Sequence, residues 1–322
     1  MFLFKGLWCK LGEIGVKKII SFFGTLLMII ALVFLWRSLS EYGMDFSLLG
    51  SPVILGGLIF VAIVEALGII LASVNYHAII KNVSGIKANR VFSMLAYTIS
   101  NLYKYIPGGV MYVVGRNRIA VETDGLSHSK VAFATVVEGV SIILGAILIS
   151  AIFSFNSLFT FTNNLEIFNE IIIAVVLIIL LLLVLALYFK QKLEPIFARF
   201  WSTVEILKPR IVAKRMCFAL VLMFVWGLSF AVTIYLLGQP MTVSLTFTLI
   251  GLYLLAWLVG FLTPGAPSGF GIREAIMLMF ISGMVYESIL LSAMIVHRVI
   301  AITADIIAYV FCLGLSRFKR VN

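Results

Sequence analysis

Charged residues are scarce in this sequence. Asp, Glu, Lys and Arg make up 12% of its 322 residues, whereas a soluble globular domain usually contains about 25%. Hydrophobic residues make up 62% and gather in long runs, with most charges falling between them. This composition excludes an ordinary soluble domain and indicates a membrane protein, because a bilayer core of about 30 Å requires roughly 20 apolar residues per spanning helix.

Cysteine, histidine and the motifs of nucleotide-binding enzymes are also scarce or lacking. The cysteines and histidines stand far apart, without the spacing of a disulfide framework or a metal site. The segment 107–109 lacks the Lys and Ser/Thr of a P-loop, and Ser268 has no G-x-S-x-G context. We therefore expect free thiols, no metal, no cofactor, no catalytic centre and no ATP hydrolysis by this chain. The six residues are Cys9, Cys217, Cys312, His77, His128 and His297.

The long apolar runs predict an all-α polytopic membrane protein. Basic residues precede the first run, as in a signal peptide, but no small-residue cleavage site follows it, so we expect an uncleaved first span. We expect residues 1–322 to form a single transmembrane domain in the plasma or inner membrane. Six runs are long enough for full spans, over residues 19–36, 52–74, 131–153, 171–189, 216–237 and 288–315.

The basic residues indicate the orientation of the chain. The net charge of +10 does not indicate nucleic-acid binding, because the Lys and Arg residues form no stripe on a soluble face. They concentrate in the N-terminal segment, around Lys81, in the segment 190–215 and at the C-terminus, and they are absent from the loop 154–169. Cytoplasmic loops are enriched in Lys and Arg, so we expect both termini in the cytoplasm.

Two further apolar stretches, 91–106 and 245–262, each end at a proline–glycine turn. In both cases an arginine stands nine residues after the proline. If each stretch is a re-entrant hairpin, each half of the chain holds three spans and one hairpin, and the halves, 19–153 and 170–315, form an inverted repeat. Broken helices in such repeats mark the binding site of many transporters. The turn residues are Pro107, Gly108, Gly109, Pro264, Gly265, Gly269 and Gly271, and the arginines are Arg116 and Arg273.

The alternative is that both prolines end ordinary spans, so that the chain crosses the membrane eight times. Both arrangements keep the two termini in the cytoplasm. The eight-span arrangement places the basic segment 190–215 outside, against the usual distribution of Lys and Arg. We therefore favour six full spans and two hairpins, over residues 91–122 and 245–285.

Several ionisable residues lie within or beside the predicted spans. A charge at the centre of a membrane helix costs about 2.5–3.5 kcal/mol on insertion scales, so it persists where it pairs or lines a wet cavity. Buried ion pairs that only stabilise the bundle are the alternative to a binding site. Because two of these residues are the arginines beside the turns, we interpret the set as substrate-binding. Its members are Glu65, Arg116, Glu138, Arg273, Glu274, Arg298 and Asp305.

The chemistry of this set suits a lipid headgroup. The guanidinium fork matches the geometry of phosphate, and helix N-termini favour anions. Carboxylates opposite the arginines suit a cationic group, or a proton that is exchanged in each cycle. A cavity that holds both signs therefore suits a phospholipid headgroup.

Two segments resemble the lysylphosphatidylglycerol synthase transmembrane family. They are KYIPGG at 104–109, followed by Arg116 and Glu138, and PGAPSGFGIRE at 264–274. The second departs from a plainer Pro-Gly-Gly-x-Gly pattern at 266–268, where we expect the local turn to differ. The resemblance covers nearly the whole chain. It implies lipid translocation by a stand-alone, flippase-like member, because the acyltransferase domain of full-length members has no counterpart here.

Together these observations predict a flippase-like transporter that moves an anionic or aminoacylated phospholipid, or another lipid phosphate, across the inner membrane. Its expected partners are membrane phospholipids or a lipid-linked substrate, a separate lipid-modifying enzyme, and a second copy of the chain. The alternatives are a non-transporting accessory subunit and a membrane transferase, each acting with a lipid-linked glycosyltransferase system. The transferase would require a nucleophile or metal cluster, which the sequence does not contain.

Overall fold

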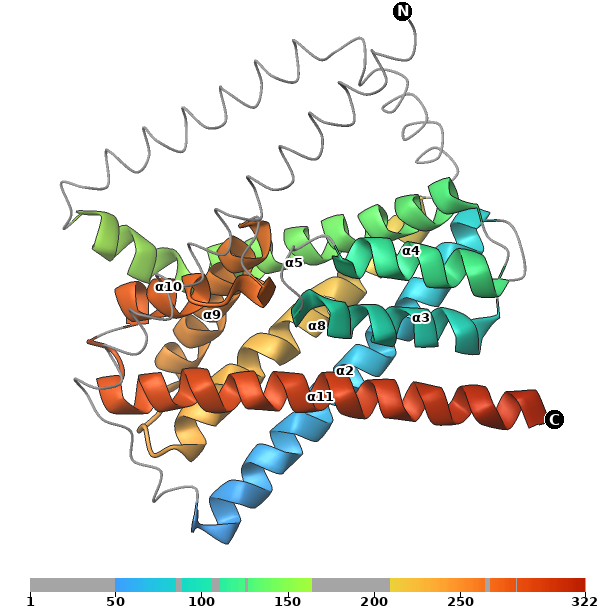
Figure 1. Cartoon of the computed structure of the whole chain (residues 1–322). Coiled ribbons are helices and arrows are strands. Elements are labelled where there is room, and N and C mark those ends of the chain that lie inside the picture. Colours follow the sequence, from blue (N-terminus) through green and yellow to red (C-terminus); the bar gives the residue numbers. More distant parts are fainter. Residues whose placement is uncertain are drawn as a thin grey trace, which may run out of the picture.

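The computed structural model describes residues 50–84, 89–105, 111–124, 127–163, 209–263, 267–281 and 283–321 (Figure 1). These residues form eight α-helices and two short 3-10 helices. The all-α prediction is thus confirmed for the described part of the chain. Two predicted spans and most turn residues lie outside the described residues, namely 19–36, 171–189, Pro107, Gly108, Gly109, Pro264 and Gly265.

Five helices are long and apolar enough to cross a membrane, with mean hydropathies between 2.1 and 2.7 in their most apolar windows. The shortest of them has 20 residues, which corresponds to about 30 Å of helix. Together they confirm a multi-pass membrane protein. The five are α2 (Pro52–Ser84), α5 (His128–Asn163), α8 (Pro209–Leu236), α9 (Val243–Leu262) and α11 (Glu287–Val321).

The outer surface of the bundle is apolar. Phe60, Ile152 and Val221 are 65%, 70% and 64% exposed, on three different long helices. Large exposed apolar side chains recur on all five long helices, and extensive apolar surface is typical of sites that contact a membrane or another protein. These faces are therefore suited to contact lipid.

Several long helices extend beyond the predicted spans. α2 continues past residue 74 to Ser84, α5 continues past residue 153 to Asn163, and α8 begins at Pro209, before residue 216. Hydropathy detects the apolar part of a helix, whereas the backbone hydrogen bonds continue into more polar sequence. The helices are therefore longer than the predicted spans at these ends.

The remaining α-helices are short and flank two breaks. The first break is η2 (Tyr103–Tyr105), which follows α3 (Arg90–Leu102), and the next described helix is α4 (Met111–Asp124). The second lies between α9 and α10 (Ile272–Ile281), with η3 (Pro267–Gly269) in between. At about 1.5 Å per residue, α3, α4 and α10 are too short to cross a bilayer core of about 30 Å.

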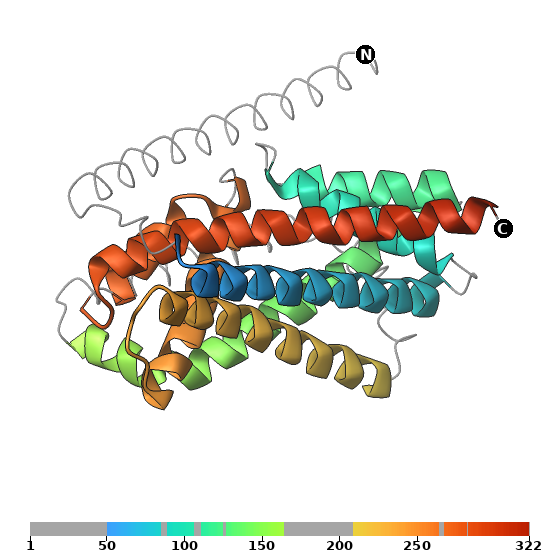
Figure 2. The same ribbon diagram turned by 90° about the horizontal axis from the view of Figure 1, so that it is seen from below.

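The two breaks meet inside the molecule. α3 packs against α4, and we call these helices with η2 the first hairpin. α9 packs against α10, and we call these helices with η3 the second hairpin. η2 contacts η3. Figures 1 and 2 show the first hairpin beside the C-terminal half of α11 and the second beside its beginning. The breaks thus approach each other near the middle of α11.

Small residues hold the long helices close around the hairpins. The Ser150 hydroxyl of α5 donates a hydrogen bond to the carbonyl of Gly251 in α9 at 2.9 Å. A Cβ atom on Gly251 would lie 2.8 Å from the backbone nitrogen of Ser154, so only glycine permits this approach. Such contacts between small residues are typical of packed membrane helices.

Candidate functional site

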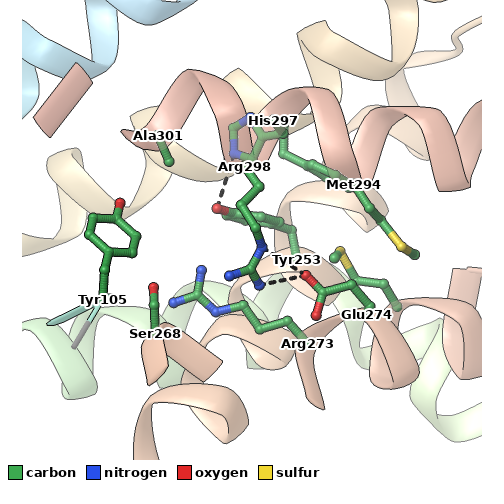
Figure 3. Close-up of a pocket in the computed structure, with 11 residues that line it drawn as sticks. Tyr105, Tyr253, Ser268, Arg273, Glu274, Met294, His297, Arg298 and Ala301 are labelled. Atoms are coloured by element: carbon green, nitrogen blue, oxygen red, sulfur yellow. Dashed lines mark hydrogen bonds and ion pairs between the residues drawn. The ribbon is translucent and has the colours of Figure 1, made fainter. Parts of the chain in front are cut away.

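A pocket lies where the two breaks meet α8, α9 and α11 (Figure 3). Its volume of about 30 Å³ holds one or two water molecules. The described conformation is therefore closed to a lipid headgroup. Polar, charged and apolar side chains line the pocket, namely Tyr105, Phe230, Tyr253, Ser268, Arg273, Glu274, Met277, Met294, His297, Arg298 and Ala301.

The second break places unusual backbone at the pocket. Ser268, Gly269 and Gly271 have φ angles of 52°, 67° and 82°, in the region that favours glycine. A Cβ atom on Gly269 would lie 2.8 Å from the backbone of Gly260 in α9, so glycine also permits close packing there. Ser268 adopts this conformation with a side chain, at the position where the sequence departs from the plainer pattern.

Glu274 joins the second break to α11. Its Oε2 atom accepts a hydrogen bond from the Gly271 backbone N–H at 2.6 Å, which caps the start of α10. Its Oε1 atom accepts from Arg298 Nη2 at 2.5 Å and from Arg298 Nε at 3.1 Å. The Arg298 guanidinium also lies 4.2 Å from the centroid of the Phe270 ring. One carboxylate thus fixes both the helix start and the arginine.

Arg273 contrasts with Arg298. Its Nε atom is buried and has no hydrogen-bond partner among the described residues. The Trp257 ring centroid lies 5.9 Å from its guanidinium carbon. Figure 3 shows its guanidinium pointing into the pocket with Ser268 and Arg298. Because a buried polar group without a partner is costly, this arginine is suited to receive an anion.

Asp305 joins the first break to α11. It is fully buried, and its Oδ2 atom accepts a hydrogen bond from the Tyr105 hydroxyl at 2.6 Å. Lys104 Nζ lies 2.6 Å from the same oxygen. Arg298 and Asp305 thus bind different hairpins, although both belong to α11.

Arg116 and Glu138 form a second polar cluster. They make a buried ion pair, and the exposed fractions of the two residues are 2% and 5%. Arg116 Nε donates to Ser100 Oγ at 3.0 Å. The Arg116 guanidinium also lies 4.2 Å and 4.8 Å from the ring centroids of Tyr97 and Tyr76. This arginine joins the arms of the first hairpin to α2 and α5 and does not line the pocket.

Glu65 lies behind the pocket wall, in the middle of α2. It is buried, and its Oε1 atom accepts a hydrogen bond from the Ser229 hydroxyl at 2.5 Å. His297 Nε2 lies 3.4 Å from the same oxygen and 3.0 Å from the Tyr253 hydroxyl. Since His297 and Tyr253 line the pocket, they connect it to Glu65.

The structure therefore divides the residues singled out in the sequence. Arg273, Glu274 and Arg298 line the pocket, whereas Arg116 and Glu138 lie elsewhere. Glu65 and Asp305 contact lining residues from behind. Sequence reasoning did not assign four residues to the site, namely Lys104 and Tyr105, which belong to the motif at 104–109, and Tyr253 and His297. For His297, which was judged isolated, the signal was an ionisable side chain inside a predicted span, next to Arg298.

Comparison with known proteins identifies the family. No curated protein matches the chain significantly. A family model described as the lysylphosphatidylglycerol synthase transmembrane region matches residues 19–308, which is most of the chain. This match confirms the resemblance carried by the two turn motifs. The chain therefore belongs to the lysylphosphatidylglycerol synthase transmembrane-region family.

Proposed function

We propose that this chain is a flippase-like transporter whose pocket binds the phosphate of an anionic or aminoacylated phospholipid, or of another lipid phosphate. The observation that carries the proposal is the Arg273 guanidinium, which points into the pocket and has a buried Nε without a partner among the described residues. A phosphate oxygen would supply the missing acceptor, and a guanidinium suits phosphate geometrically.

The neighbouring residues support a headgroup of mixed charge. Arg298 lies in the same pocket as a second cation, Glu274 lines it as a carboxylate, and Asp305 lies behind the lining residue Tyr105. A headgroup with both a phosphate and an amine would find opposite charges for each. Apolar outer faces on the long helices suit the acyl chains, which remain in lipid during movement of the headgroup.

We further propose that the two hairpins enter the inner membrane from opposite faces, within an inverted repeat of residues 19–153 and 170–315. Support comes from the short helices α3, α4 and α10 and from the contact between η2 and η3, whereas α9, the first arm of the second hairpin, has the length of a full span. A pocket at the meeting point of two such hairpins would open to one face when one hairpin moves, and to the other face when the second moves.

Transbilayer movement in vesicles tests the proposal. Purified protein would be reconstituted with labelled phosphatidylglycerol, its lysylated form or a polyprenyl-phosphate sugar. We expect movement of one class, lost at least tenfold in Arg273→Gln and retained in Lys130→Gln, which changes an exposed cation at the start of α5. Equal movement in wild type and Arg273→Gln would refute the assignment of this pocket.

A non-transporting accessory subunit is the second candidate, because the described residues bring together buried ion pairs that could serve only stability. It predicts no movement of any lipid by the purified chain, and copurification with a lipid-modifying enzyme. That enzyme would lose activity when this chain is removed.

A further inference from the structure

We propose that Glu65 is a proton-binding site, and that an anion entering the pocket brings one proton to the pair formed by Glu65 and His297. The inference rests on the proposed function and extends it to the coupling of transport. Glu65, which the sequence suggested as a ligand of the headgroup, would bind a proton instead. His297 acts as the positioning residue between Glu65 and the pocket.

Glu65 differs from the other buried carboxylates in its partners. Glu138 pairs with Arg116, Glu274 with Arg298, and Asp305 with Lys104. Among the described residues, the recorded polar partners of Glu65 are the Ser229 hydroxyl and His297. A hydroxyl and an imidazole accept either protonation state of a carboxyl group, whereas a fixed cation favours the ionised one.

The hydrogen bonds around His297 leave one ring nitrogen unprotonated, so that it can accept a proton. The Thr233 hydroxyl donates to the Ser229 carbonyl at 2.8 Å, so its oxygen is the acceptor for His297 Nδ1–H at 3.5 Å. This assigns the proton of the neutral ring to Nδ1 and leaves Nε2 as the acceptor. Nε2 reaches both the pocket residue Tyr253, at 3.0 Å, and Glu65, at 3.4 Å. A proton can therefore pass from pocket water to Glu65 through Nε2.

The charges around the pocket balance when Glu65 is ionised. Among the described residues, the charged groups near enough to act on Glu65 are Lys104, Asp305 and Arg273. Those that act on His297 are Arg273 and Arg298, and Arg298 is paired with Glu274. Within the described part of the chain, Lys104 and Arg298 thus have carboxylate partners, and the charge of Arg273 is left for Glu65 to balance.

An anion that binds Arg273 neutralises the positive charge that ionised Glu65 balances in the empty pocket. A phosphodiester carries one negative charge, so the described cluster would then carry one excess negative charge in a region of low dielectric. Uptake of one proton from water by the Glu65–His297 pair restores neutrality, and no bond other than those to the proton is made or broken. By linkage, a bound proton must raise the affinity for the anion by the same factor as a bound anion raises the affinity for the proton, so a lower pH tightens anion binding.

Proton uptake on binding tests this inference. Purified protein in weakly buffered detergent solution, with a pH-indicator dye, would be titrated with dihexanoyl-phosphatidylglycerol or with glycerophosphoglycerol, the same headgroup without acyl chains. Both are phosphodiesters that do not titrate near neutral pH. We expect about one proton taken up per anion, and an affinity that weakens by up to tenfold per pH unit once Glu65 is ionised in the empty protein.

The variant Glu65→Gln should take up no proton. Because glutamine resembles the protonated acid, this variant should bind the anion at every pH as tightly as wild type does at low pH, which also shows that it is folded. The matched controls Glu287→Gln and His128→Gln, at the starts of α11 and α5, should keep both the uptake and the pH dependence.

The outcomes separate the two proposals. Binding without proton uptake, or a pH dependence that persists in Glu65→Gln, would overturn the proton site and leave the lipid pocket standing. If neither probe binds at any pH, both the proton site and the lipid pocket are refuted. Binding of glycerophosphoglycerol with uptake, but no binding of the lipid, would support the proton site and refute a lipid as the substrate.

Discussion

Arg116 provides the sharpest test of the difference between the two arginines that follow the breaks. Arg116 is 2% exposed, paired with Glu138 and packed on two tyrosine rings. Replacing it by leucine leaves the Glu138 carboxylate buried without a cation. Breaking a buried pair in this way costs about 3–5 kcal/mol. Arg116→Leu should therefore lower the equilibrium constant for folding by roughly two to three and a half orders of magnitude.

Unfolding by SDS in detergent micelles, followed by tryptophan fluorescence, measures this change. The double variant Arg116→Leu/Glu138→Leu should recover most of the loss, because an apolar pair of similar volume removes the unpaired charge. Arg118→Leu is the control, since it changes an exposed arginine of the same helix, and surface substitutions usually stay within about 0.5 kcal/mol.

Arg273→Leu should keep the stability that Arg116→Leu loses. No described residue partners its Nε atom, and Glu65 would take up a proton once this cation is gone, so its removal should change the stability by less than about 1 kcal/mol. Transport should nevertheless be lost. If Arg116→Leu left stability unchanged and abolished transport, the reasoning would be refuted, and Arg116 would be a substrate ligand as the sequence first indicated.

Further substitutions test the two breaks and the orientation. Gly269→Ala combines a positive φ with a Cβ atom 2.8 Å from the Gly260 backbone, whereas Gly283→Ala has a positive φ and open space. Thermal unfolding should therefore show a clearly larger loss for Gly269→Ala than for Gly283→Ala, whose strain alone costs about 1–2 kcal/mol; equal losses would contradict the close packing. Asp305→Asn removes the negative charge beside Lys104. In this variant lipid movement should be slower, with only a small change in the free energy of unfolding. A large loss of stability with unchanged lipid movement would indicate a purely structural pair. A reporter that is active only in the cytoplasm should be active when fused to the C-terminus, and inactivity there would reverse the proposed orientation.

Much of the fold could be read from local patterns. The apolar runs at 52–74, 131–153, 216–237, 245–262 and 288–315 each lie in a long helix of the structure, apart from Leu237 just after α8. The predicted break before Arg273 is present as η3, with Gly269 and Gly271 at positive φ. These features are local, because helix length and backbone conformation depend on neighbouring residues. Helix ends were less predictable, since apolar content and backbone hydrogen bonding end at different residues.

The candidate site was predicted only in part. The sequence placed Arg116 and Arg273 in equivalent positions, nine residues after a proline. The structure gives the first a carboxylate partner on α5 and leaves the second in the pocket wall. His297 was judged isolated because no suitable neighbour stands near it in the sequence. Its partners Tyr253 and Glu65 come from α9 and α2.

The sequence by itself determined that this chain is a multi-pass helical membrane protein of its family, because composition, run length and short motifs carry that information. Tertiary structure alone decided which charges pair and which remain for a ligand. Tyr105 and Asp305 are 200 residues apart, and Ser229 and Glu65 are 164 apart. Contacts over such separations depend on how helices pack. In an interior of low dielectric, the packing of a single helix decides whether an arginine is neutralised by a neighbour or is left available to an anion.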